Sequence, residues 1–150
     1  MRWCVRKVKP DSVIHLGDYY DDAGVLIDEF PNLRVHQVPG NCDRYRCVGQ
    51  QPEILCYDVY GARLYMTHGH RHGVKSGIWQ LVRDARQNGA AAALYGHTHV
   101  ADCHQEECGL WVINPGSCGS FGGSCAVLEI ENGTIIDCCI LRQMDLEEMT

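Results

Sequence analysis

The sequence predicts a single layered α/β domain with its strands in two sheets, and three observations lead to this expectation. The first half of the chain alternates short β-rich runs with helical segments, whereas the second half is rich in strands. No linker and no internal repeat divides the 150 residues. A chain of this length is typical of one domain with a substantial core, so we expect residues 1–150 to fold as one unit.

The first half of the chain shows the expected alternation. A helix is expected over residues 22–30, with Asp21 or Asp22 as its N-cap and Pro31 beyond its end. Tyr60-Gly61 separates two β-rich runs and predicts an antiparallel pair. The strands expected in this half cover residues 12–16, 35–38, 53–59 and 63–66.

The clearest expected helix covers residues 74–88, where apolar side chains recur on one face and Gly89 provides the stop. Asn132-Gly133 is a strong hairpin signal between two late strands. Residues 143–150 are polar and are expected to be a frayed tail. The strands expected after the helix cover residues 91–95, 100–106, 110–113, 124–130 and 134–141.

Composition excludes several classes of function. The formal net charge of −6 argues against nucleic acid as the main partner, because binding its backbone relies on surplus basic charge. No apolar run approaches the ~20 residues that span a bilayer, and the N-terminus does not resemble a signal peptide. We therefore expect a cytoplasmic protein that is not bound to a membrane. The 10 cysteines include no Cys-x-x-Cys pair, and we expect them to be reduced and mostly buried as small apolar residues.

Four short polar segments follow predicted strands, and loops at strand ends are where such sheets place their sites. Aspartate, asparagine and imidazole groups together make a mixed oxygen and nitrogen ligand set, which suits Mn, Fe, Zn or Ni rather than Ca. Each segment alone is a weak signal, but the four in this order are specific. They are Gly17-Asp18, Gly40-Asn41-Cys42-Asp43, His68-Gly69-His70 and Gly96-His97-Thr98-His99.

In these four segments the sequence resembles the calcineurin-like metallophosphoesterases, from about residue 10 to residue 142. Cys42 after Asn41, together with the late run Asn114 to Ser117, makes the small YfcE-type phosphodiesterases the closer match. The resemblance implies a four-layer α/β/β/α sandwich. It also implies hydrolysis of a phosphodiester at a two-metal site, with a metal-bridging hydroxide as the nucleophile.

The resemblance assigns roles to five residues as metal ligands. Asp18 would bridge both ions, Asn41, His68 and His97 would complete one ion, and His99 would help to hold the other. Asp18, Asn41 and His68 would also carry catalysis. Mn is the first-choice ion, with Ni, Fe, Co or Zn as alternatives.

Three further residues are expected around these ligands. Many relatives carry a histidine after the asparagine as a general acid, and the Cys42 thiol, with an ordinary pKa near ~8.5, is a poor substitute. Asp43, which would orient that histidine, is expected to have a structural role. His70 is expected to support the ligands or contact the substrate.

The chain departs from the family pattern at its beginning, because no strand ending in Asp-x-His precedes Gly17-Asp18. Residues 1–9 match instead the end of the helix that follows that strand. We therefore expect a sandwich missing its first strand, with one well-formed metal site and one incomplete site. We also expect a late start of the given sequence rather than an evolved inactive enzyme, and a raised tendency to form homo-oligomers.

The predicted function is metal-dependent hydrolysis of a small-molecule phosphodiester, and the motifs do not identify the substrate. One alternative is an inactive metal-binding or interaction domain derived from this fold. A second alternative is a structural zinc site. Strand alternation argues against the zinc site, because it sends neighbouring residues of a strand to opposite faces. Its ligands would come from His97, His99, Cys103, His104 and Cys108.

Overall fold

The structure is a computed structural model that describes residues 1–43, 50–119 and 122–147. Its helices are α1 (Arg2–Val8), α2 (Asp22–Glu29), α3 (Trp79–Gln87) and α4 (Gln143–Glu147), with short 3-10 helices η1 (Asn41–Asp43) and η2 (His70–His72). Its strands are β1 (Ser12–His15), β2 (Arg34–Gln37), β3 (Ile54–Val59), β4 (Ala62–Thr67), β5 (Ala92–Leu94), β6 (Asp102–Gln105), β7 (Trp111–Asn114), β8 (Ser124–Glu131) and β9 (Thr134–Arg142). No helix in these ranges is long and apolar enough to span a membrane.

A five-stranded sheet in the order β3-β4-β5-β7-β6 forms the centre of the molecule. Its inner strands β4, β5 and β7 run parallel, and β3 and β6 are antiparallel edges. Alternation along β4 sends Tyr65 toward α3 and Leu64 and Met66 toward the opposite face, where all three side chains are buried. Full burial of one such apolar side chain stabilises the fold by about 1.5–3 kcal/mol.

The second layer of strands consists of two separate pairs. β1 and β2 are parallel, β8 and β9 are antiparallel, and no ladder of hydrogen bonds joins the pairs within the described residues. Both pairs nevertheless cover the same inner core, through Ile14 and Leu16 on one side and Ala126 and Leu128 on the other. Among the residues that the structure describes, β1 and β8 therefore each have one edge without a strand partner.

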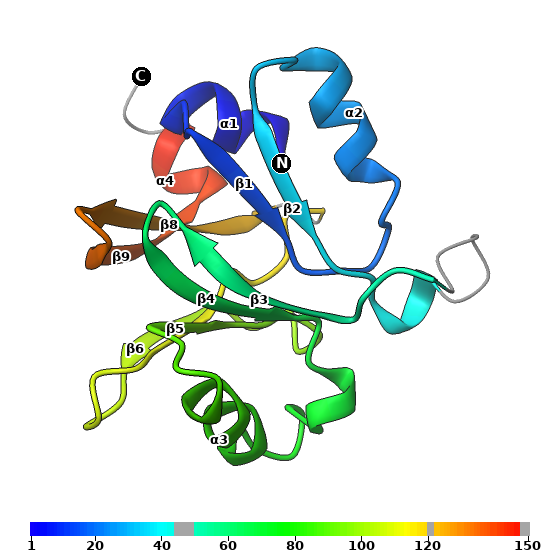
Figure 1. The fold of residues 1–150 in the computed structure, drawn as a ribbon. Helices are drawn as coiled ribbons and strands as arrows, with labels where there is room; N and C mark the ends of the chain where they lie inside the picture. The colour runs from blue at the N-terminus through cyan, green and yellow to red at the C-terminus, as the bar shows by residue number, and fades with distance from the viewer. Residues whose placement is uncertain (44–49, 120–121, 148–150) are drawn as a thin grey trace.

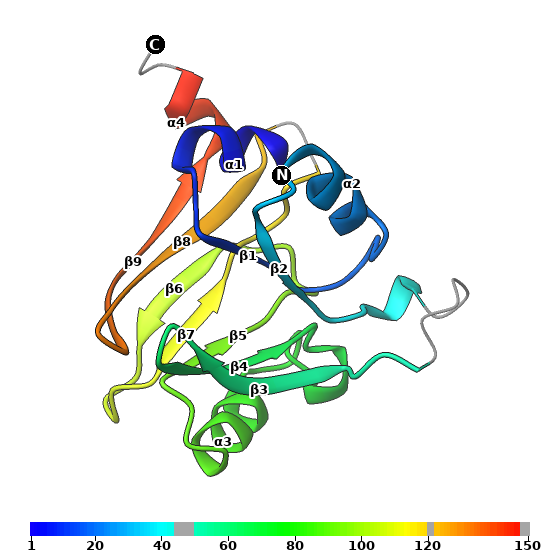
Figure 2. The same cartoon turned by 45° about the horizontal axis from the view of Figure 1, so that its top comes forward.

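The helices complete a four-layer arrangement. α3 packs on the outer face of the five-stranded sheet, while α1 and α2 lie on the far side of β1 and β2 (Figures 1 and 2). This order of layers confirms the expected α/β/β/α sandwich. The first element of the chain is helix α1 rather than a strand, as expected from residues 1–9.

Two expectations for helices were wrong in part. The long helix begins at Trp79 rather than at residue 74, because Gly77 has a φ of 149° that a helix cannot contain. Val74 still joins the core, but from a loop in which its N–H donates to Gly69 O. At the C-terminus, residues 143–147 form α4 instead of a frayed tail, and Gln143 N–H donates to Gly123 O at 2.9 Å.

The other expected elements are confirmed to within a few residues. α2 matches the helix expected over 22–30, and Asp21 occupies its N-cap position without a side-chain cap hydrogen bond. Asn132 and Gly133 both have positive φ, 50° and 77°, as the expected β8–β9 hairpin turn requires.

The expectation of reduced cysteines was wrong for one pair, because Cys4 of α1 and Cys125 of β8 form a disulfide. Alternation along β8 turns Ala126 toward the inner core, so Cys125 points to the outer face that α1 covers. A separation of 121 residues in sequence concealed this pairing. Cys47 lies outside the described residues, and the remaining cysteines are free: Cys42, Cys56, Cys103, Cys108, Cys118, Cys138 and Cys139.

Candidate metal centre

The fold brings the four polar segments to one edge of the two strand layers. Gly17-Asp18 follows β1 and Gly40-Asn41 follows its parallel neighbour β2. His68 follows β4, and Gly96-His97 follows soon after the parallel strand β5. Parallel strands end at the same edge of a sheet, so the two loops of each pair are neighbours, and the bond from His68 to Leu16 O joins one pair of loops to the other.

His68 is the centre of the cluster and is 2% exposed. Its Nδ1–H donates to the carbonyl oxygen of Leu16 at 2.7 Å, which leaves the lone pair on Nε2. That Nε2 lies 3.0 Å from Asn41 Oδ1 and 3.2 Å from His97 Nδ1. It also lies 3.5 Å from Asp18 Oδ2.

These atoms fit a divalent cation. In the neutral ring that donates from Nδ1, Nε2 of His68 carries a lone pair, as do Oδ1 of Asn41 and Oδ2 of Asp18, so a cation can bind all three atoms. Atoms bound to one ion at about 2.0–2.2 Å lie about 3.0–3.5 Å from each other, which is the spacing found. No three His, Cys, Asp or Glu side chains in the described ranges can hold an ion by themselves, so the set depends on the amide of Asn41.

The backbone of the loop that carries Asp18 lies close to the backbone of the loop that carries Asn41. Asp18 and Tyr19 both have positive φ, 59° and 56°, and the Cys42 N–H donates to Asp18 Oδ1 at 3.1 Å. A Cβ on Gly17 would lie 2.7 Å from both Gly40 N and His68 Nδ1. Glycine at position 17 is therefore needed for the close approach as well as for its φ of 95°.

The Asp43 side chain connects the loop that carries Asp18 to the loop that carries Asn41. It is 1% exposed, and its carboxylate accepts from Gly40 N–H at 2.7 Å and from Tyr20 N–H at 3.0 Å. The geometry supports the structural role expected for Asp43, since both bonds fix the backbone on either side of the ligand loops.

The histidines of the Gly96–His99 segment have different surroundings. His97 contacts His68 with ring centroids 5.0 Å apart, and burial, together with the neighbouring groups His68, Lys75 and His70, lowers the pKa of His97. A lowered pKa keeps His97 neutral, as a metal ligand must be. His99 has an exposed side chain that makes no hydrogen bond or ion pair in the described residues. The structure thus brings together Asp18, Asn41, His68 and His97, and leaves His99 at the rim.

His70 and Cys42 flank the cluster. The His70 ring centroid lies 5.4 Å from that of His68 and 6.1 Å from that of His97. Cys42 is exposed, its Sγ accepts from Asn41 Nδ2 at 3.6 Å, and the negative charge of Asp18 raises the pKa of its thiol.

The structure also adds groups that the sequence did not single out. The carbonyl oxygen of Leu16 sets the tautomer of His68, and no side-chain motif signals a backbone group of this kind. The exposed Lys75 supplies a positive charge that acts on both His97 and Cys42. The only indication of Lys75 in the sequence is that it is a basic residue a few positions after His68-Gly69-His70.

The alternative of a structural zinc site is not supported. His104 bonds to Asp102 and Glu106 at 2.9 and 3.1 Å. Cys103, on the opposite face of β6, donates to the carbonyl oxygen of Cys138. The described residues contain no metal-holding group there.

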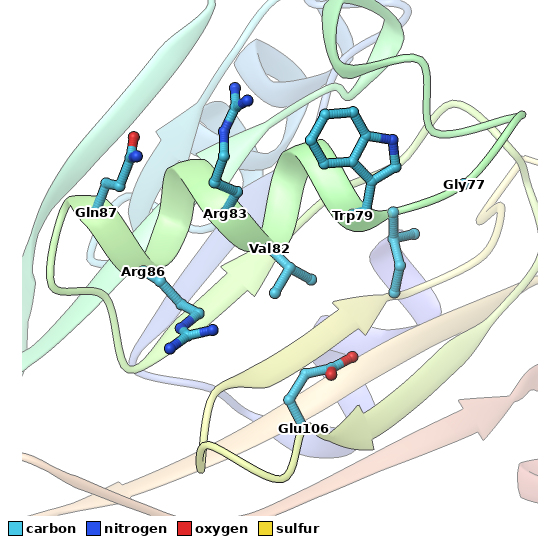
Figure 3. A pocket seen from close by; sticks show the side chains of 8 residues that line it. Gly77, Trp79, Val82, Arg83, Arg86, Gln87 and Glu106 are labelled. Carbon is cyan, nitrogen blue, oxygen red and sulfur yellow. The ribbon is translucent and has the colours of Figure 1, made fainter.

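A surface depression of about 760 Å³ lies away from the candidate ligands (Figure 3). Trp79, Val82 and Arg86 of α3 line it together with Glu106 from the β6–β7 loop. None of the candidate ligands contributes to its walls, so it is separate from the cluster around His68.

Comparison with known proteins agrees with the geometry. The chain is 32% identical over 108 residues to the probable metallophosphoesterase YsnB of Bacillus subtilis (strain 168), a match that covers 71% of this chain and 59% of that protein. The chain therefore spans less than two thirds of the length of this relative.

Solved structures share the fold. A conserved uncharacterized protein of Streptococcus pneumoniae TIGR4, predicted to be a phosphoesterase, superposes with a TM-score of 0.68 at 26% identity, covering 95% of this chain and 88% of that one. A Vps29 single mutant from Entamoeba histolytica has a TM-score of 0.70 at 19% identity, with 95% and 89% covered. The wild-type Vps29 of that organism in complex with Zn²⁺ has a TM-score of 0.67 at 19% identity, with 88% and 82% covered. At such identity, the Vps29 structures show the fold alone.

The model of the calcineurin-like phosphoesterase superfamily domain matches residues 2–133, which include all four strand-end segments. Members of this family generally bind divalent metals, in agreement with the acceptor atoms gathered around His68. The chain therefore belongs to the calcineurin-like phosphoesterase superfamily.

Proposed function

We propose that this chain is a metal-dependent phosphodiesterase that hydrolyses a small-molecule phosphodiester. The observation that carries the proposal is the convergence of Asn41 Oδ1, His97 Nδ1 and Asp18 Oδ2 on Nε2 of His68. Acceptor atoms gathered in this way, on a phosphoesterase fold, have the chemistry of a site for divalent ions. Mn²⁺ is the first choice, and Ni, Fe, Co or Zn suit the same ligands.

Asp18, Asn41, His68 and His97 would hold the metal. When bound, divalent ions of this kind activate water and neutralise charge on phosphoryl oxygens. The hydrogen bond to Leu16 O holds His68 in the tautomer that binds metal, and Asp43 keeps the Asp18 and Asn41 loops at their spacing.

Charges near the cluster favour an anionic substrate of modest size. Lys75 has an exposed side chain with no ion pair in the described part of the chain, so its ammonium group is available to a phosphoryl oxygen. The net charge of −6 opposes a long polyanion. A small phosphodiester in the cytoplasm is the substrate class that fits both features.

Of the steps in the proposed hydrolysis, protonation of the leaving group is the one that the residues of this site support least. The residue after Asn41 is a cysteine, and the charge of Asp18 raises the pKa of its thiol further. Such a thiol donates a proton poorly, so substrates with acidic leaving groups should be turned over best.

A second candidate is a metal-binding or interaction domain without turnover. One observation favours it: His99, the ligand expected for a second ion, is exposed and makes no hydrogen bond or ion pair with the other four side chains in the described residues. A one-ion site could bind metal without activating a nucleophile. Homo-oligomer formation would suit such a role, because β1 and β8 have edges without a strand partner.

Hydrolysis of bis-p-nitrophenyl phosphate, titrated with Mn²⁺, separates these candidates. The wild-type chain should show turnover that depends on Mn²⁺, and Asp18→Asn should abolish it. Asp28→Asn, which neutralises an exposed carboxylate on α2, is the matched control and should retain full activity. Mn²⁺ binding without turnover would favour the second candidate, and turnover that persists in Asp18→Asn would exclude the site.

A further inference from the structure

Asn114, the last residue of β7, is fully buried and uses both ends of its amide. Its Nδ2 donates to the carbonyl oxygen of Gly96 at 3.1 Å and to the Thr98 hydroxyl at 2.9 Å. Its Oδ1 accepts from the Gly116 N–H at 3.0 Å. One buried side chain thus joins the segment that carries His97 to the turn that follows β7.

The Gly96–Val100 segment needs such support. His97 and His99 both have positive φ, 67° and 60°, a conformation that is sterically unfavourable for residues with a Cβ. The bonds inside the segment are few: Thr98 N–H donates to Gly96 O at 2.8 Å, and Val100 N–H donates to Thr98 Oγ1 at 3.2 Å. Both acceptors in these bonds are also the acceptors that Asn114 binds.

This geometry sets the direction in which the imidazole of His97 points. His97 follows Gly96 and precedes Thr98, so Asn114 holds the backbone carbonyl on one side of it and the Thr98 side chain on the other. Its Nδ1 then lies 3.2 Å from Nε2 of His68. Without the amide, the left-handed conformation of His97 would relax and its ring would leave this position.

We propose that Asn114 is a positioning residue that holds His97 opposite His68 and thereby sets the metal affinity of the cluster. The effect on metal affinity rests on the proposed function, whereas the effect on the ring contact does not. Partners that orient metal ligands typically change metal affinity by 10–100-fold when they are removed.

Asn114→Asp is the principal test, because it keeps the size of the side chain and an oxygen for Gly116 N–H. It removes the bond donated to Gly96 O and leaves two oxygens facing each other there, while the bond to Thr98 can only persist in reverse, with the hydroxyl donating to the carboxylate. Two readouts are needed: the nuclear Overhauser contact between the His68 and His97 rings in the metal-free protein, and the Kd for Mn²⁺ by calorimetry. The variant should lose the ring contact and bind Mn²⁺ about 10–100-fold more weakly.

Milder variants keep the test valid if Asn114→Asp unfolds. Thr98→Val removes one acceptor of Asn114 and should weaken Mn²⁺ binding, while Thr98→Ser keeps the hydroxyl and should restore the wild-type Kd. Ser124→Ala is the matched control, since it breaks a bond to Pro115 O in the same turn without touching the Gly96–Val100 segment. It should lower Tm and leave the ring contact and the Kd unchanged.

The possible outcomes distinguish a positioning role of Asn114 from a contribution to the overall stability of the protein. A folded Asn114→Asp or Thr98→Val variant that keeps both the ring contact and the wild-type Kd overturns the proposal. If the wild-type chain binds no Mn²⁺, the proposed function fails, and the ring contact in the metal-free protein still decides the role of Asn114.

Discussion

At the scale of single residues, the candidate site is defined by how closely its loops approach. Gly40 is buried against Asp18, and a Cβ added at position 40 would lie 2.9 Å from Asp18 Cγ and closer still to Asp18 Oδ1. No rearrangement of a flexible side-chain end relieves this overlap, because Asp18 N is also within contact range. Glycine at position 40 is therefore required by space alone.

Gly40→Ala should destabilise the protein by about 1–3 kcal/mol, the cost of overpacking a close contact, and should displace Asp18. Gly24→Ala is the matched control, since a Cβ there meets nothing within 4 Å and lies inside α2. That change should stabilise the protein by about 0.5–1 kcal/mol, because alanine favours the helix. Urea unfolding measures both values, and equal effects of the two substitutions would contradict the steric argument.

His15 makes stability depend on pH. Burial lowers its pKa, and this effect outweighs the carboxylates of Asp22, Asp43 and Asp18, which act to raise it. Its Nδ1 accepts from Gly17 N–H at 3.3 Å, which requires the neutral ring. A folded-state pKa below the unfolded value of about 6.5 means that the unfolded chain binds more protons in this window.

The free energy of unfolding should therefore fall as the pH is lowered from about 6.5 toward the lowered pKa of His15. His15→Gln, which keeps an acceptor but does not titrate, should show a smaller loss. Urea unfolding curves at a series of pH values measure the difference. Identical pH dependence in the two proteins would show that His15 does not contribute.

At the scale of elements, the second strand layer is held together without a continuous ladder of hydrogen bonds. β1 and β8 are joined by the core beneath them and by the disulfide from Cys4 of α1 to Cys125 of β8. The cross-link joins residues 121 positions apart, and a loop of this length restricts the unfolded chain by about 4–5 kcal/mol in the chain-entropy model.

Cys4→Ser should consequently lower the Tm of the oxidised protein, whereas Cys108→Ser, which removes an exposed free thiol, should leave it unchanged. Mass spectrometry of peptides prepared without reductant should find Cys4 linked to Cys125. The thiol pool of the cytoplasm opens most such bonds. A disulfide retained in protein isolated from cells would argue against the cytoplasmic location proposed for this chain.

At the scale of the whole molecule, metal binding would be coupled to folding, because the four proposed ligands come from loops after β1, β2, β4 and β5. Unfolding separates these loops, so an ion bound to all four stabilises only the folded state. At a Mn²⁺ concentration of 100 times Kd, the gain is about 2.7 kcal/mol.

Mn²⁺ should therefore raise the Tm of the wild-type chain, and the rise should vanish in Asp18→Asn but persist in Asp28→Asn. Differential scanning calorimetry with and without Mn²⁺ measures the shift. A rise of equal size in all three proteins would place the ion elsewhere.

The sequence by itself determined the type and order of the elements and the family. Gly17-Asp18, Gly40-Asn41, His68 and Gly96-His97 could be predicted as a site because parallel strands end at one edge, so the type of each element already places the loops. The resemblance implied the same residues as ligands. Short-range patterns of turn and strand residues are local properties, and a linear sequence carries them directly.

Only the tertiary structure decided the relations between distant residues. It paired Cys4 with Cys125, divided the second strand layer into two pairs and started α3 at Trp79. It also selected the tautomer of His68 through a backbone carbonyl, and left the His99 side chain exposed. These features depend on distances between segments and on backbone groups that every residue possesses, so they cannot be read from short-range patterns of side chains.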